Sequence, residues 1–254
     1  QTLQTRYPNP RAVDRDALLE LLDDALHDRR PSLDTRRGAL PASVIGPHAR
    51  MAITVRGAAL KNARAVVLGF HGRGASADRF VAELQRRLAG TLDDVTFIAP
   101  QAHDNTWYPK GFLAPVDDNQ PSFDSALSVV DALWQELANE VGPERIVLTG
   151  FSQGACLLLT WLSCAAPALA PRRALAFTGA PTPLPQASYA AARGLDLHLS
   201  CAENDPFIQR ATFEASAARF SAAGANVSLH LVAGQEHAIH APDIEALRAT
   251  LSRI

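Results

Sequence analysis

Cysteine, long apolar runs and an excess of charge of one sign are all scarce in this sequence. Its 254 residues carry 24 lysines and arginines against 26 aspartates and glutamates, so the formal net charge is −2. A nearly neutral chain offers no strong field to the phosphates of nucleic acids or to an anionic membrane. No run of about 18 apolar residues occurs, which predicts that no segment spans a bilayer. We therefore expect a small-molecule partner of modest charge, with neither nucleic acid nor stable membrane insertion.

The few cysteines favour free thiols. Three occur, Cys156, Cys164 and Cys201. If the stretch after Ser152 is helical, the first two lie roughly 12 Å apart along its axis, too far to form a disulfide. Their odd number and the lack of metal-ligand spacing predict free, buried thiols in a reducing compartment. We expect a cytoplasmic protein, with a removed signal peptide as the alternative, because the chain begins with Gln1 rather than methionine.

The first 50 residues differ in pattern from the rest of the chain. The full sequence has 47% hydrophobic and 20% charged residues, which is typical of a soluble globular protein. Asp14 is placed to cap a helix with apolar residues at helical spacing from Leu18 to Leu26. A polar, proline-containing stretch without periodicity follows from 28 to 47. We expect residues 1–50 to form a helical extension and connector, and residues 51–254 to form the main domain.

From Met51 onward, apolar strand-like stretches alternate with helix-like stretches. The predicted strands span 51–55, 63–70, 95–99, 146–149, 174–178, 195–201 and 227–232. The predicted helices span 76–88 (with Gly90 ending the helix), 153–164, 207–223 and 241–251. A further helix has one apolar face from 123 to 137 and is expected to stop at Gly142-Pro143. This alternation predicts an α/β fold with a mostly parallel central sheet and helices on both faces. Ligands bind such sheets at the carboxyl ends of the strands, so the turns after residues 70, 149, 201 and 232 are where a site is expected.

The turn after the strand 146–149 reads Gly150-Phe151-Ser152-Gln153-Gly154. A serine hydroxyl is a poor nucleophile unless a base takes its proton, and a sharp strand-to-helix turn holds it clear of the sheet. Glycines two residues before and two residues after the serine relieve the crowding in such a turn. The pattern follows a strand and opens a helix, so we predict Ser152 as the nucleophile of an α/β-hydrolase; an ordinary glycine-rich turn is the alternative.

An oxyanion formed by attack of this serine needs two hydrogen-bond donors. One is normally the main-chain N–H of the residue after the nucleophile, here Gln153. The other comes from an early strand-to-helix turn, and the chain reads His71-Gly72-Arg73-Gly74 after the strand 63–70. We predict the N–H of Arg73 as the second donor, because the glycines let the backbone approach closely. His71 is expected to support this loop, and a role as the base is the alternative.

The base and the acid are expected late in the chain, since this fold orders its triad serine, acid, histidine. Four of the eight histidines follow Ser152, namely His198, His230, His237 and His240. The first two fall within predicted strands. His237 follows the strand 227–232 in a loop at the active edge and is the predicted base, with His240 as the alternative. Asp205 is the predicted acid because Pro206 orders the turn beyond it, and Glu203 is the alternative.

Aromatic residues gather in an irregular stretch between 101 and 120. Trp107, Tyr108, Phe112 and Leu113, together with Phe151, are predicted to form an apolar acyl or alcohol pocket beside the serine. The alternative is that these side chains merely fill the core. No phosphate-binding glycine loop and no metal-binding spacing of histidine and glutamate occurs in the sequence, so no cofactor and no metal are expected.

These elements together resemble the phospholipase/carboxylesterase family, relatives of the acyl-protein thioesterases. The resemblance extends roughly from Val55 to Leu251 and rests on the segments His71-Gly72-Arg73-Gly74, Trp107-Tyr108-Pro109, Gly150-Phe151-Ser152-Gln153-Gly154-Ala155, Asp205-Pro206 and Gly234-Gln235-Glu236-His237. It implies an α/β-hydrolase with Ser152, Asp205 and His237 as the triad and Arg73 and Gln153 as oxyanion donors. Residues 1–50 lie outside the pattern, and Pro109 stands where the thioesterases usually have an aspartate, which argues against a lipidated-protein substrate.

The sequence therefore predicts a serine carboxylesterase that hydrolyses short- to medium-chain esters through an acyl-enzyme. A lysophospholipase or acyl thioesterase shares the same machinery and differs in the length of its pocket. A non-catalytic binding protein on a hydrolase scaffold is a third hypothesis, which the intact set of serine, histidine and aspartate opposes. The sequence names no physiological ester and leaves a homodimer open.

Overall fold

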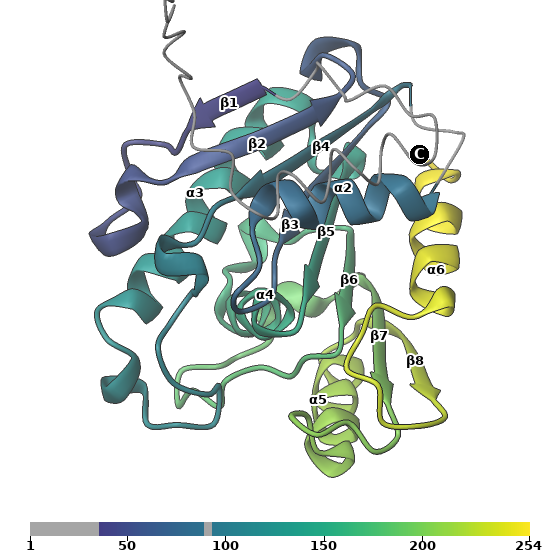
Figure 1. The fold of residues 1–254 in the computed structure, drawn as a ribbon. Coiled ribbons are helices and arrows are strands. Elements are labelled where there is room, and N and C mark those ends of the chain that lie inside the picture. The colour runs from purple at the N-terminus through teal and green to yellow at the C-terminus, as the bar shows by residue number, and fades with distance from the viewer. Residues whose placement is uncertain (1–35, 89–92) are drawn as a thin grey trace, which may run out of the picture. The chain divides into compact units, whose positions relative to one another are not determined.

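An eight-stranded sheet organises residues 36–88 and 93–254, the part of the chain that the computed structural model describes (Figure 1). Its strands are β1 (Arg36–Ala39), β2 (Ala52–Gly57), β3 (Ala65–Phe70), β4 (Val95–Pro100), β5 (Ile146–Phe151), β6 (Arg173–Phe177), β7 (Asp196–Ala202) and β8 (Asn226–Val232). The order across the sheet is β1-β2-β4-β3-β5-β6-β7-β8. β2 pairs antiparallel with both of its neighbours, β1 and β4. The six strands β4-β3-β5-β6-β7-β8 run parallel to one another. The predicted α/β architecture is confirmed.

Helices cover both faces of the sheet. They are α2 (Ala77–Leu88), α3 (Ser122–Val141), α4 (Gln153–Cys164), α5 (Arg210–Ala222) and α6 (Ala241–Leu251). The apolar sides of α2 and α6 pack in one buried cluster, whereas α3, α4 and α5 contribute to another. Strand β3 contributes side chains to both clusters. Val67 packs in the cluster of α2 and α6, and its neighbours Val66 and Leu68 pack in the cluster of α3, α4 and α5. Such strands, buried on both faces, account for the near-continuous apolar runs in the sequence.

Local signals set several helix ends. The Ser76 hydroxyl accepts a hydrogen bond from the N–H of Arg79 at 3.3 Å, which caps the start of α2 as expected. Helix α3 stops at Val141, directly before the Gly142-Pro143 pair predicted to end it, and Gly142 takes a φ of 84° that L-residues rarely adopt. Helices α4 and α6 have their predicted bounds. The helix predicted between residues 18 and 26 and the helix-ending Gly90 lie outside the described residues.

The connector predicted from 28 to 47 is wrong in its last part. Residues 36–39 form the edge strand β1, whose Gly38 and Ala39 pair with Ile53 and Ala52 of β2. Leu40 and Val44 are buried in the core, and residues 46–50 form a 3-10 helix beside α3. Four residues are too few to show a strand period, so only the pairing with β2 reveals this element. Residues 36–50 therefore fold with the sheet, while the division of the chain near residue 50 remains an expectation for residues 1–35.

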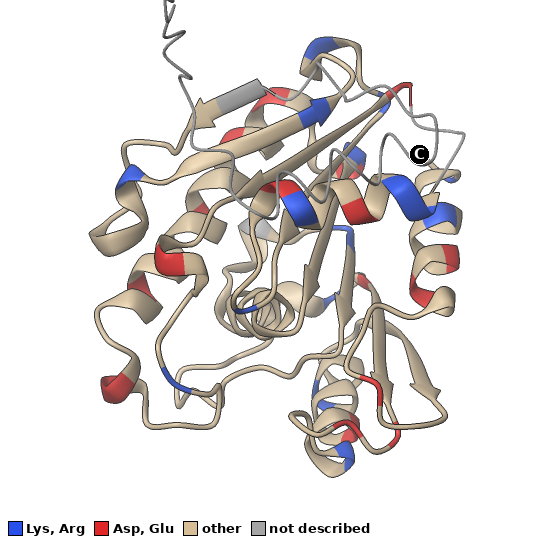
Figure 2. Cartoon of the chain, viewed as in Figure 1, with Lys and Arg blue, Asp and Glu red and all other residues tan. Residues whose placement is uncertain are grey.

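Charges of both signs alternate along α2, whereas α6 carries its acidic residues in its first half and a basic residue in its last turn (Figure 2). All three cysteines are free, as predicted; Cys156 and Cys201 are buried and Cys164 is half-buried. Within the described ranges, no helix combines the length and apolar character needed to cross a membrane.

Candidate active site

The turn between β5 and α4 holds Ser152 in a strained conformation. Its φ of 53° and ψ of −118° are rare for any residue other than glycine. A Cβ at Gly150 would lie 2.6 Å from the carbonyl oxygen of Gly154, and a Cβ at Gly154 would lie 2.1 Å from that of Phe70. Both approaches are closer than real side chains allow. The two glycines of the motif are therefore needed for this turn to close.

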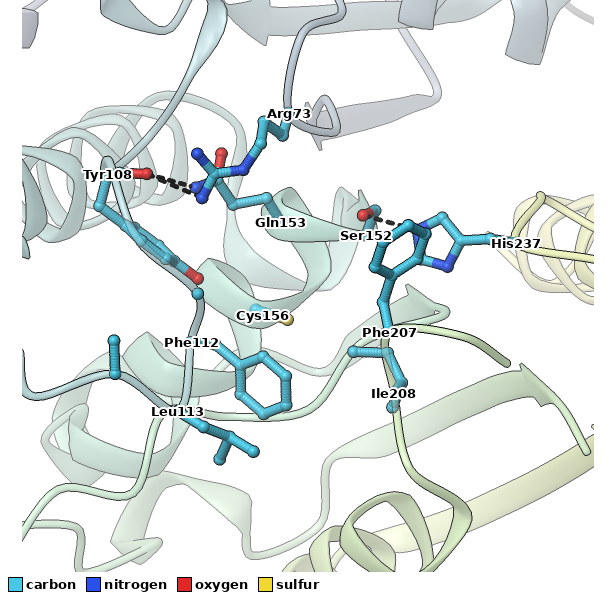
Figure 3. A pocket seen from close by; sticks show the side chains of 12 residues that line it. Arg73, Tyr108, Phe112, Leu113, Ser152, Gln153, Cys156, Phe207, Ile208 and His237 are labelled. Atoms are coloured by element: carbon cyan, nitrogen blue, oxygen red, sulfur yellow. Dashed lines mark hydrogen bonds between the residues drawn. The ribbon is translucent and has the colours of Figure 1, made fainter. Parts of the chain in front are cut away.

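Three predicted residues meet at the carboxyl edge of the sheet. Ser152 follows β5, Asp205 follows β7 and His237 follows β8. The Oγ atom of Ser152 lies 2.8 Å from Nε2 of His237, and Nδ1 of His237 lies 2.8 Å from Oδ2 of Asp205 (Figure 3). The Asp205 side chain is fully buried and that of His237 is 17% exposed. This arrangement lets the imidazole take a proton from the hydroxyl while the carboxylate holds the other ring nitrogen protonated.

The second carboxylate oxygen of Asp205 is also occupied. Oδ1 accepts hydrogen bonds from the main-chain N–H groups of Phe207 and Ile208, both at 2.8 Å. The carboxylate is therefore held in one orientation, with Oδ2 directed at His237. The same two bonds fix the short segment that carries Phe207 and Ile208 toward the serine.

The alternative base and acid have other contacts. His240 is the N-cap of α6, where its side chain accepts from the N–H of Asp243 and its own N–H donates to Asp243 Oδ2 at 2.7 Å. His198 lies 3.1 Å from the other oxygen of Asp243, and its ring packs against His230. Glu203 is exposed. His240, Asp243, His198 and His230 form a separate polar cluster around the start of α6, and within the described residues no hydrogen bond joins this cluster to Ser152.

Two main-chain N–H groups beside the serine are unused. Neither Arg73 nor Gln153 donates its N–H to an acceptor within the described residues. Gln153 is the first residue of α4, where the helix dipole favours negative charge. The Arg73 loop lies close by, since a Cβ built on Gly72 would lie 3.4 Å from Cβ of Ser152. The arrangement suits stabilisation of an oxyanion on a carbonyl attacked by Ser152.

His71 contacts the backbone of its surroundings rather than Ser152. Its Nδ1–H donates to the carbonyl of Gly72 at 2.8 Å, and its Nε2 accepts from the N–H of Ala102 at 3.1 Å. Burial lowers the pKa of His71 from its ordinary 6.5 to about 4, so the ring is neutral at pH 7. His71 therefore joins two loops, in agreement with the supporting role expected for it.

A mostly apolar cavity of about 470 Å³ opens beside Ser152. It is lined by Arg73, Tyr108, Gly111, Phe112, Leu113, Ala114, Ser152, Gln153, Cys156, Phe207, Ile208 and His237 (Figure 3). Burial raises the pKa of the Cys156 thiol to about 12, so this side chain serves as a neutral part of the wall. No group of histidine, cysteine and acidic residues in the described ranges is arranged to hold a metal ion.

The structure corrects part of the predicted pocket. Tyr108 and Phe112 line the cavity, whereas Trp107 and Phe151 do not. Trp107 is fully buried, and its indole N–H donates to the carbonyl of His71 at 2.8 Å. Tyr108 reaches the cavity, while the Trp107 ring enters the core and packs against Phe70 and His71. The ring of Phe151 packs against His237 with 5.3 Å between centroids.

Phe207 and Ile208 belong to the cavity wall and were not predicted. Phe207 is 68% exposed and contacts the His237 ring edge to face, with 4.8 Å between ring centroids. The available signal was their position, since two large apolar residues directly follow the predicted acid and Pro206. Position alone does not predict that these two residues line the cavity. The prediction needs the hydrogen bonds from their N–H groups to the Asp205 carboxylate.

The sheet order, the covering helices and the strand–Ser152–helix turn define an α/β-hydrolase. A sequence model of the phospholipase/carboxylesterase family matches residues 53–254, and the chain belongs to this family. It is similar to a phospholipase/carboxylesterase from Dyadobacter fermentans, with 30% identity, a TM-score of 0.70, and coverage of 82% of this chain and 99% of that one. The family and this neighbour indicate a hydrolase of the carboxylesterase type.

More distant structures share the fold. A carboxylesterase from Mesorhizobium loti is 20% identical, with a TM-score of 0.62, over 80% of this chain and 94% of that one. Separately, 30 residues of this chain are 73% identical to maleylacetate reductases of Pseudomonas knackmussii and Pseudomonas aeruginosa. That match covers 12% of this chain and 8% of the reductases, so it concerns a short segment rather than a domain.

Proposed function

We propose that this protein is a serine carboxylesterase that hydrolyses short- to medium-chain carboxylic esters through an acyl-enzyme. The observation that carries the proposal is the pair of 2.8 Å contacts linking Ser152 to His237 and His237 to Asp205. A serine in this setting has a base within reach, and the base has a partner that sets its tautomer. The substrate is a small-molecule ester, which agrees with the nearly neutral chain.

The proposed reaction has two halves. Ser152 Oγ attacks the ester carbonyl while His237 Nε2 takes the hydroxyl proton, and the Asp205 carboxylate stabilises the imidazolium. The main-chain N–H groups of Arg73 and Gln153 receive the oxyanion. Collapse of the resulting tetrahedral intermediate expels the alcohol, which takes its proton from His237, and leaves an acyl group on Ser152. His237 then deprotonates a water molecule that attacks the acyl group, and the carboxylic acid departs as Ser152 regains its proton.

The cavity supports an acyl chain of limited length. Its volume of about 470 Å³ is in the lower half of the usual range for ligand pockets. Each methylene buried against Phe112, Ile208 and the Tyr108 ring contributes about 0.8 kcal/mol. Rates should therefore rise with chain length until the cavity is full, and we expect the maximum between butyrate and octanoate.

One observation favours the second candidate, a lysophospholipase or acyl thioesterase. Leu113 and Phe207 line the cavity yet are 55% and 68% exposed, so apolar surface continues outward from it. A longer acyl chain could lie along these two side chains. Hydrolysis of p-nitrophenyl esters from acetate to palmitate separates the candidates, since a maximum beyond decanoate supports the second and a maximum at eight carbons or fewer supports the first.

The mechanism is tested by Ser152→Ala. The variant should keep its fold and lose roughly 10⁴- to 10⁶-fold in kcat, because no other group can form the acyl-enzyme. Labelling by a fluorophosphonate should disappear as well. Ser188→Ala, which changes an exposed serine outside the cavity, is the matched control and should react normally. Near-normal turnover by the Ser152 variant would show that another residue is the nucleophile.

A further inference from the structure

The Arg73 side chain binds three consecutive carbonyl groups. Its Nη1 donates to Pro109 at 2.8 Å, and its Nη2 donates to Tyr108 at 3.0 Å and to Lys110 at 2.5 Å. Within the described part of the chain, no carboxylate forms an ion pair with this guanidinium. Its charge is instead met by the backbone dipoles of one short segment. A planar fork of donors suits this task in a way that a single ammonium group does not.

The Gln153 side chain binds the same segment from α4. Its Oε1 accepts from the Thr106 hydroxyl at 3.1 Å and from the N–H of Trp107 at 3.0 Å. Its Nε2 donates to the carbonyl of Tyr108 at 2.7 Å. The Arg73 and Gln153 side chains therefore meet on one acceptor, the Tyr108 oxygen, where two dashed lines converge in Figure 3. Gln153 is only 6% exposed, so its amide depends on these partners.

The bound segment leads directly into the cavity wall. The Tyr108 ring lines the cavity, and residues 111–114 continue the lining immediately after the three bound carbonyls. The far end of the segment is held by Asn119, whose Oδ1 accepts from the N–H of Lys110 at 2.7 Å. The position of this wall relative to Ser152 is thus set by side chains from the loop that carries Arg73 and from the first residue of α4.

We infer that Arg73 and Gln153 form a clamp that couples the oxyanion hole to the acyl pocket. Each residue offers its main-chain N–H to the oxyanion and its side chain to the segment 106–110. A shift of that segment therefore displaces both donors, and a shift of either donor moves the pocket wall. In this inference, which rests on the proposed function, the two side chains are positioning residues for both the oxyanion and the acyl chain.

The first test compares Arg73→Lys with Arg86→Lys. Arg86 lies on α2, is half-exposed and pairs with Glu83, so its change controls for the loss of a guanidinium elsewhere. Arg73→Lys keeps the N–H and the charge but places its donors on one nitrogen, which cannot match the separate positions of Nη1 and Nη2. We expect kcat/KM for p-nitrophenyl butyrate to fall about 10- to 100-fold, the range expected when a reacting group is misplaced by up to an ångström. The loss for the acetate ester should be several-fold smaller, because acetate barely contacts the wall.

A double-mutant cycle tests the coupling. Gln153→Met keeps the volume and the N–H of Gln153 and removes its amide. Because both side chains hold the Tyr108 carbonyl, the loss in Arg73→Lys/Gln153→Met should be smaller than the product of the two single losses. The ratio of butyrate to acetate hydrolysis should change in the same direction in all three variants.

The outcomes separate this inference from the proposed function. A slower but complete fluorophosphonate reaction at Ser152, together with a changed butyrate-to-acetate ratio at near-normal Tm, supports the clamp. Unchanged kinetics in Arg73→Lys would overturn the clamp while the serine mechanism stands. The same holds if the loss of kcat/KM in the double variant equals the product of the two single losses and the butyrate-to-acetate ratio stays constant. If Ser152→Ala keeps its activity, the proposed function itself fails.

Discussion

At the scale of single residues, the Asp205 carboxylate has two tasks at once. One oxygen receives the imidazole N–H of His237, and the other receives the N–H groups of Phe207 and Ile208. The carboxylate therefore orients the His237 imidazole and also shapes the neighbouring cavity wall. A side chain substituted at this position has to accept hydrogen bonds from N–H donors on both sides.

Asp205→Asn should lower kcat by about 10⁴-fold. The amide oxygen will face the two N–H groups, which need an acceptor, and the NH₂ group will then face Nδ1 of His237. That contact forces the proton onto Nε2, which can no longer accept the proton of Ser152. Steady-state kinetics and the Tm decide the point. An Asn variant with activity within tenfold of the wild type would place the acid elsewhere, with Glu203 as the next residue to change.

His71 predicts a pH dependence of stability. Its pKa of about 4 in the folded protein lies below the ordinary 6.5 because of burial, so the unfolded chain binds more protons between these values. The neutral His71 ring therefore contributes about 3 kcal/mol to the free energy of unfolding. This stabilisation is fully present above pH 6.5 and is lost as the pH falls toward 4. Protonation would also set an N–H of the ring against the N–H of Ala102. His48, whose pKa burial lowers as well, acts in the same direction.

Urea unfolding between pH 7 and pH 4 measures this effect in the wild type, His71→Gln and His103→Gln. The His71 variant should lose stability less steeply on acidification, and His48 should contribute to the slope that remains. The exposed His103 serves as the control and should leave the slope unchanged. Equal slopes in the wild type and the His71 variant would contradict the prediction.

At the scale of elements, the segment 106–114 divides its aromatic residues between the core and the cavity. Trp107 packs against Phe70 and His71, while Tyr108 and Phe112 line the cavity. The segment is irregular and takes its shape from the side chains that bind its backbone. Its residues therefore have different roles although they are close in sequence.

Trp107→Ala should destabilise the protein by about 3 to 5 kcal/mol, the usual result of truncating a fully buried aromatic residue. Phe112→Ala should instead enlarge the cavity and move the preferred acyl chain to greater length, with a smaller loss of stability. Chain-length profiles and urea unfolding of both variants check the division. A shifted profile in the Trp107 variant at normal stability would return that residue to the pocket.

At the scale of the whole molecule, residues 36–50 complete the sheet at the edge opposite β8. β1 covers the edge of β2, and Leu40 and Val44 are 8% and 4% exposed within the core. Ser152, Asp205 and His237 all lie on loops that follow parallel strands. The edge therefore stabilises the fold without supplying a reacting group.

A chain that begins at Gly46 lacks β1, Leu40 and Val44. Its free energy of unfolding should be about 3 to 6 kcal/mol lower than that of a chain that begins at Arg36, since each buried aliphatic side chain contributes about 1.5 to 3 kcal/mol. The exposed edge of β2 should also promote association. Urea unfolding and fluorophosphonate labelling compare the two chains. A folded Gly46 chain that fails to label would show that this edge shapes the site.

Much of the fold was predictable because its signals are local. Near-continuous apolar strands, the Ser76 cap and the glycines around Ser152 act over a few residues through backbone geometry and periodicity. The order of the nucleophile, acid and base along the chain narrowed the choice to Asp205 and His237, and the structure brings both to Ser152. β1 escaped prediction because its pairing partner, rather than its own four residues, makes it a strand.

The sequence by itself determined the class of fold, the turn at Ser152 and the loops that meet there. Only the tertiary structure decided that Trp107 is a core residue, that Phe207 and Ile208 line the cavity, and that Arg73 and Gln153 hold one carbonyl together. These contacts join residues far apart in the chain, such as Ser152 and His237 at a separation of 85 and Arg73 and Pro109 at a separation of 36. Local pattern governs backbone conformation, whereas the partner of a side chain depends on how distant elements pack.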